Sequence, residues 1–167
     1  RSYELIESLK TDKLIIALVA EFSRGKTELL NALFFSDHKQ RLLPSQAGRT
    51  TMCPTELQYD EKVEACIQLL PIETRASSTS IAEYKRSSIN WTTLPLELAD
   101  SAKMAEVFRE IVQTKRVTVR TARELGLYSP EADPHGAALH ADGGVDIPVW
   151  RHAVINYPHP LLKQGLV

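Results

Sequence analysis

The residues with the clearest chemistry in this sequence are Gly25, Lys26 and Thr27, which stand between an apolar run and an apolar-periodic stretch. In that setting the loop N–H groups point at a polyphosphate, the lysine ammonium lies over the terminal phosphates, and the threonine hydroxyl ligates Mg²⁺. The N-terminus of the helix that begins there adds partial positive charge at the same place. We therefore predict a phosphate-binding loop over residues 20–27.

The loop departs from the usual pattern G-x-x-x-x-G-K-[ST] because Ala20 stands where the first glycine is expected. The flanking elements support the prediction. Leu14–Val19 is an apolar run of strand length, as expected for a central parallel strand covered on both faces. Apolar residues recur at helical spacing after Lys26, so the loop lies between a strand and a helix. The alternative is an ordinary strand–turn–helix with an exposed lysine.

Composition narrows the class of protein. The length of 167 residues suits one domain or slightly more, and the net charge of −1 gives no electrostatic case for a nucleic-acid partner. We see no signal peptide and no apolar run of membrane-spanning length. Cys53 and Cys66 are too few for a disulfide framework. We therefore expect a cytoplasmic protein in a reducing compartment.

The pattern of apolar residues predicts an α/β domain with a sheet flanked by helices. We divide the chain into an N-terminal helix at residues 1–12 and a domain at 13–167 that carries an insertion at about 73–150. In chain order we expect strands at 55–59 and 64–70 joined as a hairpin, a helical turn near 81–84, helices at 98–114 and 118–125, a loop over 128–146 and a strand at 153–157.

Two parts of the chain resemble bacterial dynamin-like GTPases. Val19–Leu33 is similar to the family's first nucleotide motif, which has Gly-Lys-Ser/Thr followed by Leu-Ile/Leu-Asn-Ala-Leu. Tyr157–Leu162 resembles a segment that the family places just before its third motif. The likeness covers residues 13–59 well and 154–167 fairly.

A second stretch of the same region is similar to the family's switch I. Leu42-Leu43-Pro44 is followed by Thr50 and Thr51, and then by Pro54. In the family a switch I threonine closes over Mg²⁺ and the γ-phosphate. The Thr-x-x-Pro spacing makes Thr51 the matching residue.

The resemblance implies a role for each matching residue. Lys26 would bind the β- and γ-phosphates, and Ser23 occupies a loop serine used near the transferring phosphate. The implied nucleotide-binding residues are Phe22, Ser23, Arg24, Gly25, Lys26, Thr27 and Glu28. The implied catalytic residues are Ser23, Arg24 and Thr51, and the implied Mg²⁺ ligands are Thr27 and Thr51.

Two loop residues have alternative interpretations. The guanidinium of Arg24 could stabilise the charge that develops in phosphoryl transfer, whereas the alternative is a solvent-facing arginine at the loop tip. Phe22 stands where eukaryotic dynamins have a glutamine that helps catalysis. A phenyl ring neither orients water nor accepts a proton, so that contribution is missing from this loop.

The resemblance further implies a P-loop NTPase (G-domain) fold of three layers with a mainly parallel sheet. The family's third motif, Asp-x-x-Gly, and its base-reading Asn/Thr-Lys-x-Asp motif do not follow a strand anywhere in this sequence. We therefore expect the N-terminal piece of a larger GTPase, cut before the third motif. We expect these residues alone to bind GTP weakly and to hydrolyse it negligibly.

Residues 128–146 hold two patterns that we interpret as coincidental. Asp133–Gly136 fits Asp-x-x-Gly, but no apolar strand precedes it and prolines crowd it. Asp133, His135, His140 and Asp142 could be imagined as a metal cluster, but they lie in a Gly/Pro-rich loop without fixed spacing. We expect a solvated loop there.

The implied function is GTP binding and hydrolysis with Mg²⁺, with GTP-driven homodimerisation through the GTPase domain. In the family this is coupled to membrane or partner remodelling, with peripheral membrane association through regions outside this chain. One alternative is an ATP-using P-loop protein, because the loop itself does not read the base. The other is a nucleotide-dependent switch or scaffold with little turnover, which Ala20 and Phe22 favour.

Overall fold

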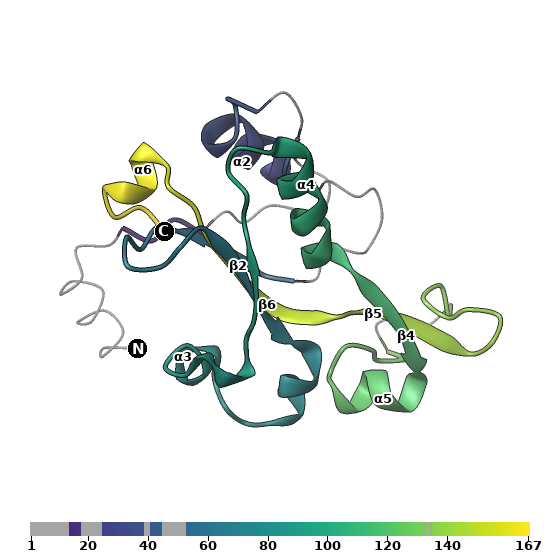
Figure 1. The fold of residues 1–167 in the computed structure, drawn as a ribbon. Coiled ribbons are helices and arrows are strands. Elements are labelled where there is room, and N and C mark those ends of the chain that lie inside the picture. Colours follow the sequence, from purple (N-terminus) through teal and green to yellow (C-terminus); the bar gives the residue numbers. More distant parts are fainter. Residues whose placement is uncertain (1–13, 18–24, 39–40, 45–52, 132, 134) are drawn as a thin grey trace.

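A four-stranded sheet forms the centre of the molecule, and a two-stranded sheet extends from one end of it (Figure 1). The computed structural model describes residues 14–17, 25–38, 41–44, 53–131, 133 and 135–167. The elements in chain order are α2 (Lys26–Phe34), β1 (Thr55–Gln58), β2 (Cys66–Pro71), η1 (Ile72–Ala76), α3 (Ile81–Tyr84), η2 (Ser88–Asn90), β3 (Thr92–Pro95), α4 (Ser101–Arg109), η3 (Glu110–Val112), β4 (Thr114–Thr118), α5 (Val119–Glu124), β5 (Gly144–Pro148), β6 (Trp150–Asn156) and α6 (Pro160–Lys163).

The strand order of the main sheet is β1-β6-β2-β3, with β6 between the two strands that we expected to form a hairpin. The expected hairpin of residues 55–59 and 64–70 is therefore wrong. The last strand of the chain takes the central place because Ala153, Val154 and Ile155 are all buried and need cover on both faces. The pairing of β1 with β6 joins residues 98 positions apart, such as Thr55 and Ala153, beyond the reach of local patterns.

The described sheet is mixed rather than mainly parallel. β1 runs parallel to β6, with Thr55 opposite Ala153, whereas β2 runs antiparallel to both β6 and β3. The α/β class agrees with the structure, but the expected mainly parallel sheet is not confirmed by these strands.

Residues 14–16 pair in parallel with residues 165–167. The Leu14 N–H donates to the Gly165 carbonyl at 2.8 Å, and the Val167 N–H donates to the Leu14 carbonyl at 2.9 Å. The first residues of the predicted strand thus have a parallel partner. The expected cover on both faces is not seen, because the described neighbours leave Leu14 and Ile15 64% and 65% exposed.

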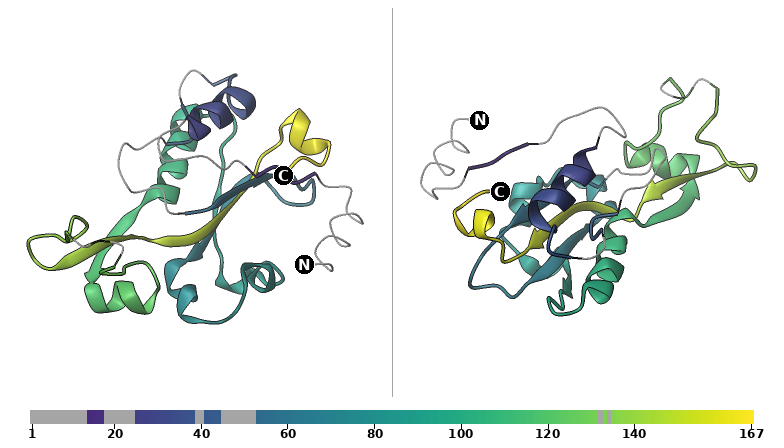
Figure 2. Two further views of the ribbon diagram at one scale, coloured as in Figure 1. Left: turned by 180° about the vertical axis from the view of Figure 1, so that it is seen from behind. Right: turned by 90° about the horizontal axis from the view of Figure 1, so that it is seen from above.

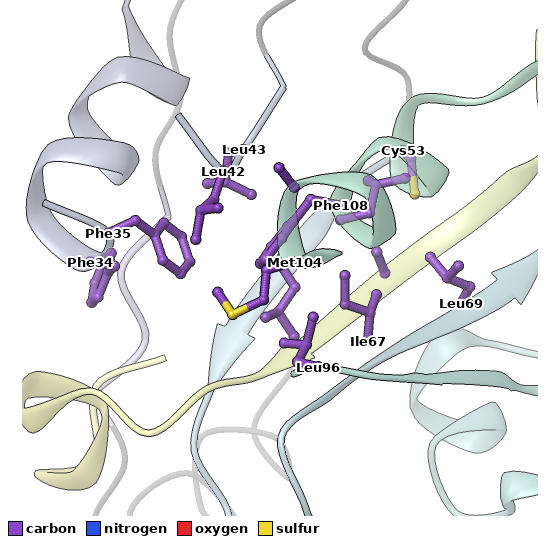
Figure 3. Packing of buried hydrophobic residues seen from close by; sticks show 14 of the residues in the cluster. Phe34, Phe35, Leu42, Leu43, Cys53, Ile67, Leu69, Leu96, Met104 and Phe108 are labelled. Atoms are coloured by element: carbon purple, nitrogen blue, oxygen red, sulfur yellow. The ribbon is translucent and has the colours of Figure 1, made fainter. Parts of the chain in front are cut away.

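The main core lies between one face of the sheet and the helices α2 and α4 (Figure 3). Phe108 of α4 is fully buried and meets Phe35 edge to face, with the ring centroids 5.5 Å apart. Ile67 and Leu69 of β2 belong to the same buried cluster, because alternate strand residues share a face. On the opposite face, the ring of Trp91 meets His152 edge to face and Lys85 pairs with Glu56, so the segment around α3 lies against that side of the sheet.

The helices of residues 81–124 largely agree with the sequence expectations. α4 and η3 together cover most of the predicted helix at 98–114, and Asp100 caps α4 by accepting from the N–H groups of Ala102 and Lys103. α5 begins after its cap Thr118 and ends before Gly126, whose φ of 66° is the left-handed value that favours glycine. None of the helices among the described residues is both long and apolar enough to cross a membrane.

The strands β4 and β5 were not predicted. They pair antiparallel, and α5 packs on them over a small second core of buried residues: Ile72, Ala122, Leu125, Val145 and Ile147. We call this β4–α5–β5 region the side unit. All views place it at one end of the molecule and α6 at the other (Figure 2). In contrast, β3 and α4, which also fall within the expected insertion at 73–150, belong to the main sheet and core.

The N-terminal helix expected at residues 1–12 lies outside the described residues. The division of the chain into that helix and one domain with an insertion stays a prediction.

Candidate phosphate-binding site

The helix α2 starts where the sequence predicts the phosphate-binding loop to end. Gly25 stands immediately before it with φ 81° and ψ 9°, a left-handed conformation that glycine adopts without strain. Among the described residues, a Cβ built on Gly25 would meet no atom within 4 Å, and no side chain caps the helix. The first N–H groups of a helix have no intrahelical acceptors. An open helix start of this kind suits an anion.

Lys26 and Thr27 are half-buried in the first turn of α2. Both residues thus belong to the start of a helix, which agrees with the expected order of loop and helix. The Glu28 carboxylate instead forms an ion pair with Arg41 at 3.0 Å. Its amide, rather than its side chain, is the group suited to a phosphate.

The other predicted site residues lie outside the described residues: Phe22, Ser23, Arg24 and Thr51. Their roles, and the binding and metal roles of Gly25 to Glu28, stay predictions. The structure brings the described four together at one helix end.

Aromatic packing fixes the far end of α2. The ring of Phe34 meets His159 edge to face at 5.1 Å, and the ring of Phe35 meets Tyr157 at 4.9 Å and Phe108 at 5.5 Å. Such pairs add to the stabilisation from burial. The helix α2 is thus held against α4 and the residues that follow β6, and a site on a packed helix keeps its geometry better than one on a loop.

Sequence reasoning missed Asn31, a polar residue that α2 buries to 8% exposure. Its Nδ2 donates to the carbonyl oxygen of Leu43 at 3.0 Å, and its Oδ1 accepts from the Leu43 N–H at 2.9 Å. Both hydrogen bonds reach the Leu42-Leu43-Pro44 segment that resembles the start of switch I. An asparagine flanked by Leu30 and Ala32 within an apolar-periodic helix was the available signal.

A second polar group lies on the opposite face of the sheet. His152, 5% exposed, has its Nε2 3.0 Å from the Oε1 of Glu56, and the Lys85 ammonium is 2.6 Å from the same oxygen. The hydrogen bond from His152 is the largest cause that holds the pKa of Glu56 at about 2, below its ordinary value of 4.5. Because alternate residues of β1 and β6 face opposite sides, this ion cluster is separated from the main core by the sheet.

The residues of the two patterns in 128–146 that we interpreted as coincidental form hydrogen bonds and ion pairs of their own. The Asp133 carboxylate accepts from the N–H groups of Ala137 and Ala138 at 2.8 and 2.9 Å, so it closes a turn. His140 lies 2.8 Å from Asp146, and Asp142 pairs with Arg116. The part of the chain that the structure describes holds no cluster of three or more His, Cys, Asp or Glu arranged for a metal ion.

Comparison with known proteins identifies one family. The sequence model of the Dynamin family matches residues 16–164, which include the predicted loop, α2, the main sheet and the side unit. A search of curated proteins finds no match to the chain.

Proposed function

Because the chain belongs to the dynamin family, whose domain binds GTP, we propose that it is part of a GTPase that hydrolyses GTP with Mg²⁺. Lys26 binds the β- and γ-phosphates, and Ser23 and Arg24 lie beside the transferring phosphate. Thr51 closes over the γ-phosphate as part of switch I. The observation that carries the proposal is the placement of Gly25, Lys26 and Thr27 at the open start of α2.

The residues at the start of α2 fit a nucleotide-bound magnesium ion. Mg²⁺ takes oxygen ligands and is usually held by one or two protein groups together with substrate phosphates. Thr27 offers a hydroxyl in the first helical turn, and the space beside Gly25 is open among the described residues. Thr27 and Thr51 would hold the ion, which neutralises charge on the phosphates when bound. The residues themselves position the phosphates and, through Lys26, place a positive charge over them.

The activity that we propose for the whole protein is based on its family. We propose GTP-driven dimerisation through this domain, coupled to remodelling of a membrane or a partner by parts of the protein outside these residues. The same proposal places the protein in the cytoplasm, with peripheral association to a membrane.

Competition binding tests the choice of nucleotide. A fluorescent GTP analogue bound to the full-length protein should be displaced by GTP and not by ATP at equal concentration. Displacement by ATP alone would instead favour the ATP-using alternative. Binding of GTP without turnover, with and without lipid vesicles, would favour a nucleotide-dependent switch.

A further inference from the structure

The contact between Asn31 and Leu43 joins two parts of the proposed GTPase site that are separate in sequence. Asn31 lies in α2, which begins with Lys26 and Thr27. Leu43 lies in the segment that leads along the chain to Thr51. One side chain satisfies both backbone groups of Leu43, at 3.0 and 2.9 Å. The contact therefore fixes the position of the Leu43 backbone relative to the phosphate-binding helix.

The surroundings of this contact make it costly to lose. Leu42 and Leu43 are 1% and 8% exposed, and they lie between α2 and Phe108 of α4 (Figure 3). Water cannot easily replace the amide of Asn31 there, and a buried N–H or carbonyl without a partner is strongly unfavourable. The nearby Arg41–Glu28 ion pair joins the same two segments, but its side chains are 69% and 44% exposed. Exposed ion pairs contribute little, so among the described residues Asn31 makes the stronger polar connection between the two segments.

We propose that Asn31 is a positioning residue for GTP hydrolysis, which holds the Leu43 backbone, in the segment that resembles the start of switch I, against the helix that begins with Lys26 and Thr27. This inference rests on the proposed function. Asn31 touches neither the nucleotide nor the reacting atoms in this account. Its loss should therefore lower kcat while the KM for GTP changes little.

Asn156 provides a matched control, because it is a buried asparagine that also fixes a loop. It is 4% exposed, accepts from the Asp60 N–H at 2.7 Å and donates to the Val63 carbonyl at 2.8 Å. That loop joins β1 to β2 and carries none of the predicted site residues. Loss of Asn156 should therefore lower stability without a specific effect on turnover.

The experiment compares Asn31→Ala, Asn31→Asp and Asn156→Ala in the full-length protein, with kcat expressed per folded molecule. In Asn31→Ala we expect kcat to fall about tenfold to a hundredfold, as for a displacement of about 1 Å in a positioned group. In Asn156→Ala we expect kcat to stay near that of the wild type. Equal losses of kcat in these two variants would overturn the proposal.

Asn31→Asp adds a signature that general destabilisation would not give. The ionised carboxylate cannot donate to the Leu43 carbonyl, whereas the protonated form donates and accepts as the amide does. Burial beside a carbonyl oxygen should raise the pKa of the new carboxyl group. The kcat of Asn31→Asp relative to wild type should thus rise as the pH is lowered toward 5. A ratio that stays constant with pH contradicts the proposal.

A separate readout distinguishes failure of this inference from failure of the proposed function. If the wild-type protein hydrolyses no GTP, the proposed function is wrong. Amide hydrogen exchange then still tests the contact itself. The Leu43 amide should be protected in wild type and in Asn156→Ala, and should lose protection in Asn31→Ala. Unchanged protection in Asn31→Ala would overturn the anchoring role.

Discussion

The main sheet and the side unit are both strands covered by helices, but their interiors differ. The main core brings together the aromatic rings of Phe35 after α2, Phe108 in α4 and Tyr157 after β6, which are far apart in sequence. The core of the side unit is aliphatic, and four of its five buried residues come from residues 122–147. All the predicted phosphate-binding residues that the structure describes belong to α2 or its start. We therefore expect nucleotide binding to depend on the main core, and the side unit to contribute to stability alone.

The largest loss of unfolding free energy should come from Phe108→Ala in the main core. Phe108 is fully buried and packs edge to face on Phe35, which follows α2 directly. We expect the free energy of unfolding to fall by about 3 to 5 kcal/mol, the usual cost for a buried phenylalanine. Nucleotide affinity should fall with it, because α2 loses its support. Urea unfolding and titration with a fluorescent GTP analogue measure the two quantities, and unchanged affinity would break the link between this core and the site.

Ile147→Ala makes the corresponding change in the side unit, where Ile147 is 1% exposed. The cost should be about 2 to 3 kcal/mol, near the low end for a buried isoleucine, because a small core can collapse around the cavity. Amide protection should fall in β4, α5 and β5, while nucleotide affinity stays as in wild type. A loss of affinity as large as that of Phe108→Ala would show that the side unit supports the site.

The ion cluster of Glu56, His152 and Lys85 predicts a smaller effect that depends on pH. The folded state lowers the pKa of Glu56 from 4.5 to about 2, so its stabilising contribution is present above pH 4.5 and is lost as the pH falls toward 2. The carboxylate is partly exposed, and solvent screening limits this contribution to about 1 kcal/mol. The loss of unfolding free energy between pH 7 and pH 3 should be smaller in Glu56→Gln than in wild type. Identical losses in both proteins would contradict the assignment.

The smallest effect should come from Arg116→Gln at the surface of the side unit. Arg116 forms ion pairs with Asp142 at 3.3 Å and Asp146 at 3.1 Å, and all three side chains are substantially exposed. Exposed pairs are screened by water and salt. The melting temperature should change little, and any difference from wild type should vanish in high salt. A large drop that persists in salt would mean that these pairs organise the side unit.

The sequence predicted the local elements better than the pairing of strands. The cap Thr118 and the closing Gly126 bound α5 as expected, and the apolar run at 153–157 forms most of β6. β4 was missed because Thr-Lys-Arg-Val-Thr is largely polar, and only Val117 of this strand packs on the core of the side unit. The hairpin prediction failed because the position of β6 depends on contacts across about 90 residues.

In the candidate site, too, local features were predicted and long-range contacts were not. The motif predicted Lys26 and Thr27 at a helix start, because the spacing of Gly-Lys-Thr carries the geometry of phosphate binding. Asn31 and His152 were not predicted, because their importance arises from burial and from partners that only the folded chain brings near. A polar residue within an apolar pattern predicts that its side chain has a hydrogen-bond partner, but the sequence does not show which residue that partner is.

Steady-state GTP hydrolysis by the full-length protein tests whether the start of α2 is the phosphate-binding site of a GTPase. The comparison is between wild type, Lys26→Ala and Lys62→Ala, where Lys62 is an exposed lysine in the turn between β1 and β2. The account predicts GTP turnover that requires Mg²⁺, is lost in Lys26→Ala and is kept in Lys62→Ala. Turnover in Lys26→Ala equal to that of the wild type would contradict the assignment of the start of α2 as the phosphate-binding site.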